Sequence, residues 1–296
     1  FAIAWGIWKK VKIDFVILVG LITTLLSLIV MLIQMHLEWN IQLMAFVGLM
    51  IGGLTGLIYS AFHAYASVNM KANQVISGTA LNMFALAFTV FFARQMFGVK
   101  KIDLTNSYYI SKVPILSKIP FIGDVVFSGT YLSTFVVAAI FVIAIIVLYK
   151  TPFGLRLRAC GENPQAADSL GINVYKMRYA GVLISGFFAG IGGVVFSLSF
   201  SNNFDGTVAG FGFLALAVLI FSAWKPKRII YIALFFGFMR VLSNTYSSIP
   251  LIREIKADTN LYNMLPYIAT IVVLAFVSKK SQAPRASGEP YDPGKR

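Results

Sequence analysis

The chain has 296 residues, of which 58% are hydrophobic and 12% are charged, and its mean hydropathy is +0.79. Soluble domains carry about 25% charged residues, so this composition excludes an ordinary soluble globular protein. The formal net charge of +14 does not indicate nucleic-acid binding, because the basic residues lie at the ends of apolar runs and do not cluster with stacking aromatics. The chain is therefore predicted to be all-α, a polytopic helical membrane protein in contact with the lipid bilayer.

Residues that bind metals or form disulfides are scarce. Cys160 is the single cysteine, which excludes an internal disulfide and a cysteine cluster for a metal. His36 and His63 are the only histidines, and neither lies in a zinc-binding spacing. We therefore expect no metal site and no cofactor bound by this chain.

Apolar runs long enough to cross a bilayer recur along the chain. A membrane-spanning helix needs about 20 apolar residues, and the length of the chain leaves room for about eight such helices. The first eight residues are compatible with the end of a further helix. The predicted helices cover residues 13–33, 42–64, 75–94, 130–149, 179–200, 209–224, 229–247 and 265–278.

Two of these helices share glycines at a spacing of about four residues. Small residues at this spacing let two helix backbones approach closely in lipid. Helix packing is one interpretation, and an internal duplication, which transporters often show, is the other. The glycines expected at helix contacts are Gly48, Gly52, Gly56, Gly186 and Gly190.

Most Lys and Arg residues fall in segments that face the cytoplasm if both ends of the chain are inside the cell. This orientation predicts a transmembrane region over residues 1–280 in the cell membrane, with a cytoplasmic loop at 150–178. The segment 95–129 is basic although it would lie outside, where its length weakens the charge rule. Residues 281–296 contain too little apolar surface to fold and are expected to form a flexible cytoplasmic tail.

The cytoplasmic loop contains signals for a short helix that stands clear of the membrane. Asn163 suits the N-cap, Pro164 the first helical position and Gly171 the position just past the end. A loop that only joins two membrane helices is the alternative interpretation. The small and apolar side chains expected on the exposed face, which would fit the groove of a partner protein, are Ala166, Ala167 and Leu170.

Polar side chains gather at the mouth of the predicted helix at 75–94. Amides and hydroxyls within lipid need hydrogen-bonding partners, so they should face other helices or a wet path. Both interpretations stay open, and the second gives neutral hydrogen-bonding groups for a polar solute. The candidates for a translocation path are Asn73, Gln74, Ser77, Thr79 and Asn82.

Four stretches resemble the permease subunits of ABC importers of the branched-chain amino acid, ribose and nucleoside class. They are KANQVISGTALN (71–82), GLRLRACGENPQAADSLGINV (154–174), GFFAGIGG (186–193) and GTVAGFGFLALA (206–217). The tail APRASGEPYDPGKR is similar to that of the simple-sugar and nucleoside branch. A motif usual in the N-terminal third of this family, Asn-Ile-Gly-(Leu/Ile)-Glu-Gly, is absent from residues 1–50.

The resemblance implies that the cytoplasmic loop docks on a separate ATPase subunit. It also implies a second permease subunit, the same or paralogous, and an extracytoplasmic solute-binding protein as partners. No GxxxxGK[ST] phosphate loop occurs in the sequence, so ATP would bind to the partner subunit and not to this chain. The residues expected to couple the chain to the ATPase are Gly161, Glu162, Asn163, Pro164, Ala166, Ala167, Asp168, Leu170 and Gly171.

The function predicted from these features is that of a permease subunit for a neutral polar solute, a nucleoside or a simple sugar. The 11 carboxylates are expected in loops or at helix ends, which disfavours a proton-coupled transporter. Sodium coupling through carbonyl groups, and a branched-chain amino acid as the solute, remain as alternatives. An enzyme is disfavoured because no nucleophile and base lie at the same depth in the predicted helices.

Overall fold

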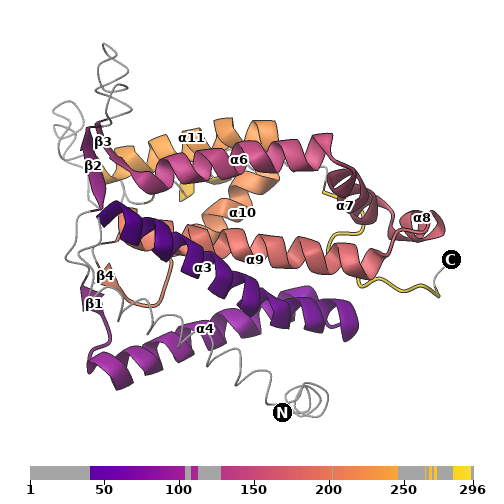
Figure 1. Ribbon diagram of the computed structural model, residues 1–296, viewed down its shortest axis with the longest axis horizontal. Coiled ribbons are helices and arrows are strands. Elements are labelled where there is room, and N and C mark those ends of the chain that lie inside the picture. The colour runs from indigo at the N-terminus through magenta and orange to yellow at the C-terminus, as the bar shows by residue number, and fades with distance from the viewer. Residues whose placement is uncertain are drawn as a thin grey trace. The chain divides into compact units, whose positions relative to one another are not determined.

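The computed structural model describes residues 41–103, 108–112, 128–201, 203–245, 264, 267–268, 270–271 and 283–294. The predicted helix at 13–33 lies outside the described residues, as does most of that at 265–278. Helices make up most of the described chain, which confirms the all-α class (Figure 1). Five of them are long and apolar enough to cross a membrane.

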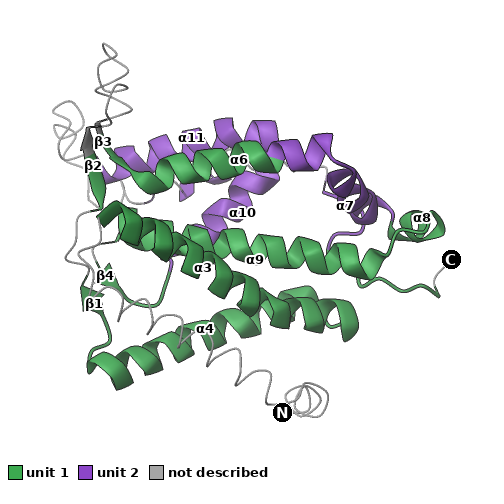
Figure 2. Ribbon diagram, viewed as in Figure 1, with its two compact units in different colours: residues 1–144, 164–207, 288–296 green, residues 145–163, 208–287 purple. Residues whose placement is uncertain are grey.

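The chain forms two compact units (Figure 2). Unit 1 comprises residues 1–144, 164–207 and 288–296, and unit 2 comprises residues 145–163 and 208–287. The described helices of unit 1 are α3 (Ile41–Ala64), its π-helical extension η1 (Tyr65–Asn69), α4 (Gln74–Phe97), most of α6 (Leu132–Lys150), α8 (Pro164–Ser169) and α9 (Val174–Ser199). Those of unit 2 are the end of α6, α7 (Pro152–Glu162), α10 (Phe211–Phe221) and α11 (Pro226–Thr245).

Helix α9 begins at Val174, five residues before the predicted start at 179. The Asn173 side chain accepts a hydrogen bond of 2.9 Å from the backbone N–H of Lys176 and so caps the first turn. Hydropathy alone places the start later, because Lys176 and Arg178 interrupt the apolar run although they continue the helix.

Helix α10 differs from the predicted span at 209–224. It has 11 residues, which at the rise of an α-helix measure about 16 Å, whereas a hydrocarbon core is about 30 Å thick. It ends in a turn where Ala223 and Trp224 have φ values of 51° and 56°, and α11 starts directly after this turn. The Phe221 ring at the end of α10 stacks on the Phe236 ring in the middle of α11, with the ring centres 5.7 Å apart, so α10 and α11 form a helical hairpin.

The closest helix pair in unit 1 is α3 with α9, which run antiparallel. Their backbones touch at glycines, because a Cβ added to Gly56 would overlap the carbonyl oxygen of Gly186 and lie 2.9 Å from the backbone nitrogen of Gly190. A Cβ on Gly190 would in turn overlap the carbonyl oxygen of Gly52. Gly48 lies farther from this crossing, since its added Cβ would meet only Val194, at 4.0 Å.

Short strands join the connections at the end of unit 1 where α4 and α9 terminate. They were not expected from the sequence, which in the segment 95–129 shows no clear alternation of polar and apolar residues. One antiparallel pair is β1 (Ile102–Asp103) with β4 (Asn203–Phe204), and the other is β2 (Tyr109–Lys112) with β3 (Ser128–Tyr131). The pairing of β1 with β4 ties the chain that leaves α4 to the chain that leaves α9.

The glycine contacts make a prediction for stability. Replacing Gly190 by Val should lower the stability of the protein by about 2 kcal/mol or more, because the side chain would collide with backbone atoms, which cannot move aside as a side chain can. Thermal unfolding in detergent measures the loss. Gly192 is the matched control on the same helix, since an added Cβ there meets nothing within 4 Å, and Gly192→Val should unfold at nearly the wild-type temperature. Equal unfolding temperatures for the two variants would contradict the close crossing.

Candidate functional site

The chain leaves α6 through a sharp corner in unit 2. The Thr151 hydroxyl donates a hydrogen bond of 2.6 Å to the carbonyl oxygen of Val147 and accepts one of 3.2 Å from the N–H of Gly154. Pro152 occupies the first turn of α7, and an added Cβ on Gly154 would overlap the backbone of Leu148. Helix α7 was not predicted from the sequence, although Thr followed by Pro is a signal for a helix start.

Helix α8 follows within the loop, as the signals at Pro164 and Gly171 predict. Gly171 has a φ of +79°, a conformation that glycine adopts without strain. The N–H of Gly171 donates to the Asp168 carbonyl oxygen at 2.8 Å, and the N–H of Ile172 donates to that of Ala167 at 3.1 Å, which closes the helix. Asn163 terminates α7, since its N–H donates to the Ala159 carbonyl oxygen at 2.9 Å.

The exposed face of α8 differs from the expected one at one position. Ala167 is buried, with 2% of its surface exposed, because its side of the helix turns inward together with Pro164. The expectation that Ala167 contributes to the outer surface is therefore wrong. Leu170 is 81% exposed. The other exposed residues of the predicted coupling set are Glu162, Asn163, Ala166, Asp168 and Gly171, and Gly161 is half-buried.

The C-terminal segment was expected to form a flexible tail. Its described residues make contacts within both units, those at 283–287 in unit 2 and those at 288–294 in unit 1. In unit 2 the N–H of Ala286 donates to the Gly161 carbonyl oxygen at 3.0 Å, and Arg285 pairs with Glu162 at 3.2 Å. In unit 1 the aromatic ring of Tyr291 is buried. Composition alone does not reveal these contacts, because they need surfaces that come from other parts of the chain.

The predicted path residues at the start of α4 have varied surroundings. The Asn73 side chain caps the helix, accepting hydrogen bonds from Val75 N–H at 2.9 Å and Ile76 N–H at 3.2 Å. The Ser77 hydroxyl lies 3.1 Å from Nδ1 of His63 on α3. The Tyr59 hydroxyl, one helical turn before His63 in α3, donates to the Leu81 carbonyl oxygen at 2.6 Å. Polar contacts thus join α3 to α4.

The other predicted path residues are less enclosed. The Thr79 hydroxyl donates back to the carbonyl oxygens of Val75 and Ile76 at 3.0 Å, and its side chain is exposed. Asn82 is also exposed, and Gln74 is half-buried. The five residues therefore do not form one cluster: Asn73 supports the helix start, Ser77 faces α3, and Thr79 and Asn82 lie on the open surface of α4.

Arg240 is a basic residue within α11, a helix that is long and apolar enough to cross a membrane. Its guanidinium lies 5.5 Å from the centre of the Phe211 ring at the start of α10. A cation over an aromatic face is stabilised without a carboxylate, which suits a charge near the end of an apolar helix. Arg240 thereby connects α11 to the first residue of α10, at the open end of the α10–α11 hairpin.

The cap on α4 can be tested by substitution. Asn73→Ala should lower the stability by about 1 kcal/mol, because two backbone N–H groups lose their acceptor. Asn73→Ser should retain most of the stability, since a serine hydroxyl caps a helix comparably. Thermal unfolding of the three proteins in one detergent compares them. A loss of the same size in both variants would show that the amide itself, and not the cap, is needed.

Comparisons with known proteins agree with the architecture. Residues 13–274 match the family described as branched-chain amino acid transport system / permease component. The guanosine ABC transporter permease protein NupQ of Bacillus subtilis is 42% identical over 244 residues, which cover 81% of this chain and 76% of that protein. The nucleoside ABC transporter permease protein NupC of Lactococcus lactis is also 42% identical, over 82% of this chain and 76% of its own length.

A more distant relative is the putative glucose ABC transporter permease protein TsgC13 of Haloferax volcanii. It is 29% identical over 256 residues, which cover 80% of this chain and 77% of that protein. No solved structure matches the chain with significance. The family match covers most of the sequence, and it includes every described helix that is long enough to cross a membrane. This chain therefore belongs to the permease component family of the branched-chain amino acid transport system.

Proposed function

We propose that this chain is the membrane-spanning subunit of an ATP-driven importer for nucleosides. The observation that carries the proposal is the 42% identity, over about four fifths of the chain, to two permeases whose names specify guanosine and nucleosides. The helices α3, α4, α6, α9 and α11, which are long and apolar enough to cross a membrane, supply the scaffold that such a permease needs. ATP would bind to separate ATPase subunits, because the sequence contains no phosphate loop.

The proposed arrangement places the chain in the cell membrane with α8 and both chain ends on the cytoplasmic side. The Lys and Arg residues of the 150–178 loop support this orientation, since cytoplasmic loops carry an excess of positive charge. Lys71 and its neighbours, at the connection between η1 and α4, would lie on the same side. Further partners would be a second permease subunit and, on the outer side, a solute-binding protein.

The exposed part of α8 is the proposed contact with the ATPase. Leu170 projects at its end with 81% of its surface exposed, and Ala166 offers a small side chain that lets a partner approach closely. An exposed leucine beside small residues fits a hydrophobic groove on another protein. Burial of Ala167 and Pro164 holds this surface in place on the permease.

A displacement of α8 would reach the membrane helices of unit 1 through continuous packing. The C-terminal end of α8 leads through the four residues 170–173 into α9, whose first residue Val174 is 1% exposed. Helix α9 contacts α3 backbone to backbone at Gly56 and Gly186. Close-packed backbones cannot slide independently without a steric clash, so α8, α9 and α3 would move as one body during alternating access.

The solute path is proposed to include polar groups of α4. Thr79 and Asn82 present a hydroxyl and an amide on an exposed surface of a helix that would lie in the membrane. Such neutral donors and acceptors suit the ribose hydroxyls and base edges of a nucleoside, and they do not require a charge to be paired. Ser77, in contact with His63, would border this surface.

A simple sugar is the second candidate solute. The 29% identity to a putative glucose permease supports it, and hydroxyl recognition would use the same neutral groups. The higher identity to the guanosine and nucleoside permeases favours a nucleoside.

The docking surface on α8 makes a specific prediction. Leu170→Arg should abolish copurification of the ATPase subunit and ATP-dependent uptake, because a charge would have to be buried in the partner's apolar groove. Leu170→Met is the matched control, since it keeps an apolar side chain of similar volume and should retain both. Thermal unfolding should be unchanged in both variants, because Leu170 is exposed. A fully coupled Leu170→Arg importer would contradict the docking assignment.

The solute class is tested by competition. Proteoliposomes that contain the complete importer should take up radiolabelled guanosine when ATP is supplied. Excess unlabelled nucleosides should reduce this uptake strongly, whereas ribose, glucose and leucine should leave it nearly unchanged. Competition by glucose and not by nucleosides would support the sugar candidate, and competition by leucine would support amino acid transport.

A further inference from the structure

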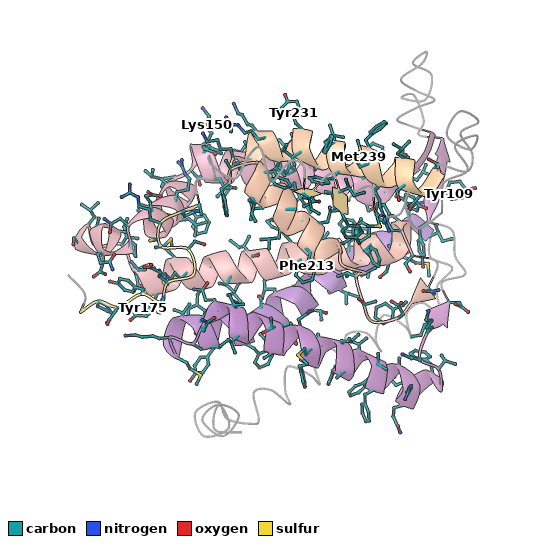
Figure 3. All side chains as sticks on the ribbon, turned by 180° about the vertical axis from the view of Figure 1, so that it is seen from behind. Tyr109, Lys150, Tyr175, Phe213, Tyr231 and Met239 are labelled. Atoms are coloured by element: carbon teal, nitrogen blue, oxygen red, sulfur yellow. The ribbon has the colours of Figure 1, made fainter. Side chains whose placement is uncertain are left out.

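The segment 289–292 near the end of the chain, here named the strap, crosses the end of unit 1 that carries α8. It contacts three segments that are distant from it in the sequence. The strap reaches α8 at Asp168, the first turns of α9 at Tyr175 and Arg178, and the connection between η1 and α4 at Lys71. Figure 3 shows Tyr175 beside the strap.

Tyr291 is the centre of these contacts. It is 5% exposed, in a segment whose flanking residues Glu289 and Pro290 are exposed. Its ring packs edge to face on Tyr175 with the ring centres 5.4 Å apart. The Arg178 guanidinium lies 5.8 Å from the centre of the same ring. The buried aromatic ring therefore anchors the strap to the start of α9.

The hydroxyl of Tyr291 extends the contact to α8, where it interacts with the Asp168 carboxylate. Burial and, next, hydrogen bonding to Asp168 raise the pKa of Tyr291, so the hydroxyl stays protonated and can act as a donor. Asp168 lies on the last turn of α8, next to the proposed docking surface.

The remaining contacts hold the two ends of the strap, at Glu289 and Asp292. Arg178 Nη1 donates to the Glu289 carbonyl oxygen at 2.7 Å. Lys71 pairs with Asp292 at 3.2 Å, with both side chains nearly half exposed, and such a pair stabilises only slightly. The strap is thus held mainly by the packing of the Tyr291 ring and by the hydrogen bond from Arg178 to the main chain, and the exposed ion pair contributes little.

We propose that the strap positions α8 for energy coupling, with Tyr291 as the positioning residue. This inference rests on the proposed function, in which α8 contacts the ATPase. A six-residue helix is too short to be stable by itself, so tertiary contacts must hold it against α9. Tyr291 links Asp168 to Tyr175 and Arg178. A displacement of α8 by the ATPase would therefore move the first turns of α9, and the connection at 170–173 would not simply bend.

The test compares transport with ATP hydrolysis in the complete importer. The permease variants are purified with their partner subunits and reconstituted in proteoliposomes, and radiolabelled guanosine uptake is divided by ATP hydrolysed. Tyr291→Ala should retain the copurified ATPase but lower this ratio by about five-fold or more, the size of a typical coupling effect. Tyr291→Phe, which keeps the ring and removes the hydroxyl, should lower it less.

Glu289→Ala is the matched control, because Glu289 contacts Arg178 through its main-chain oxygen, and it should retain the wild-type ratio. The ratio does not depend on how much folded importer is present, so a merely structural loss leaves it unchanged. A wild-type ratio in Tyr291→Ala overturns the proposal, and where that variant does not fold, a wild-type ratio in Tyr291→Phe overturns it. Leu170→Arg tests the proposed function separately: if it still copurifies the ATPase and supports uptake, the docking surface fails whatever the Tyr291 variants show.

Discussion

The backbone contact between α3 and α9 is the constraint on which the rest of unit 1 depends. Lipid surrounds membrane helices with apolar groups, so burial of apolar side chains supplies little force between them, and close packing must supply it instead. Gly52, Gly56, Gly186 and Gly190 remove the side chains that would separate the two backbones. The crossing fixes where α9 lies, and α9 carries α8 at one end and leads to β4 at the other.

Two kinds of polar contact complete this scaffold in the described part of unit 1. Main-chain and hydroxyl bonds, such as Tyr59 to the Leu81 carbonyl oxygen, join α3 to α4. The charged groups of the α8 end, Asp168, Arg178 and Lys71, contact the strap outside the spanning part of the helices. This separation suits the proposed permease for neutral solutes, in which these charged groups would take part in coupling while amides and hydroxyls of α4 would face the solute.

Much of the candidate site could be predicted from local signals, and the remainder could not. Pro164 and Gly171 mark the ends of α8 because they act on their own backbone geometry. The burial of Ala167, the role of Asn73 as a cap and the docking of Tyr291 were not foreseen. Each depends on which face a short segment presents to a distant part of the chain, and a six-residue helix has too few residues for periodicity to reveal its buried side.

The membrane class, the helical architecture and the position of the loop helix could all be predicted before the fold was known, since hydropathy, glycine spacing and cap residues act over a few turns. The sequence also pointed to the permease family through motifs that lie in four separate stretches. The folded chain was needed to show that α10 is a short helix in a hairpin, that strands join the ends of α4 and α9, and that the C-terminal segment contacts α8. These features depend on contacts between residues separated in the chain, such as Phe221 with Phe236 and Tyr291 with Asp168. Local composition does not identify which distant residues will come into contact.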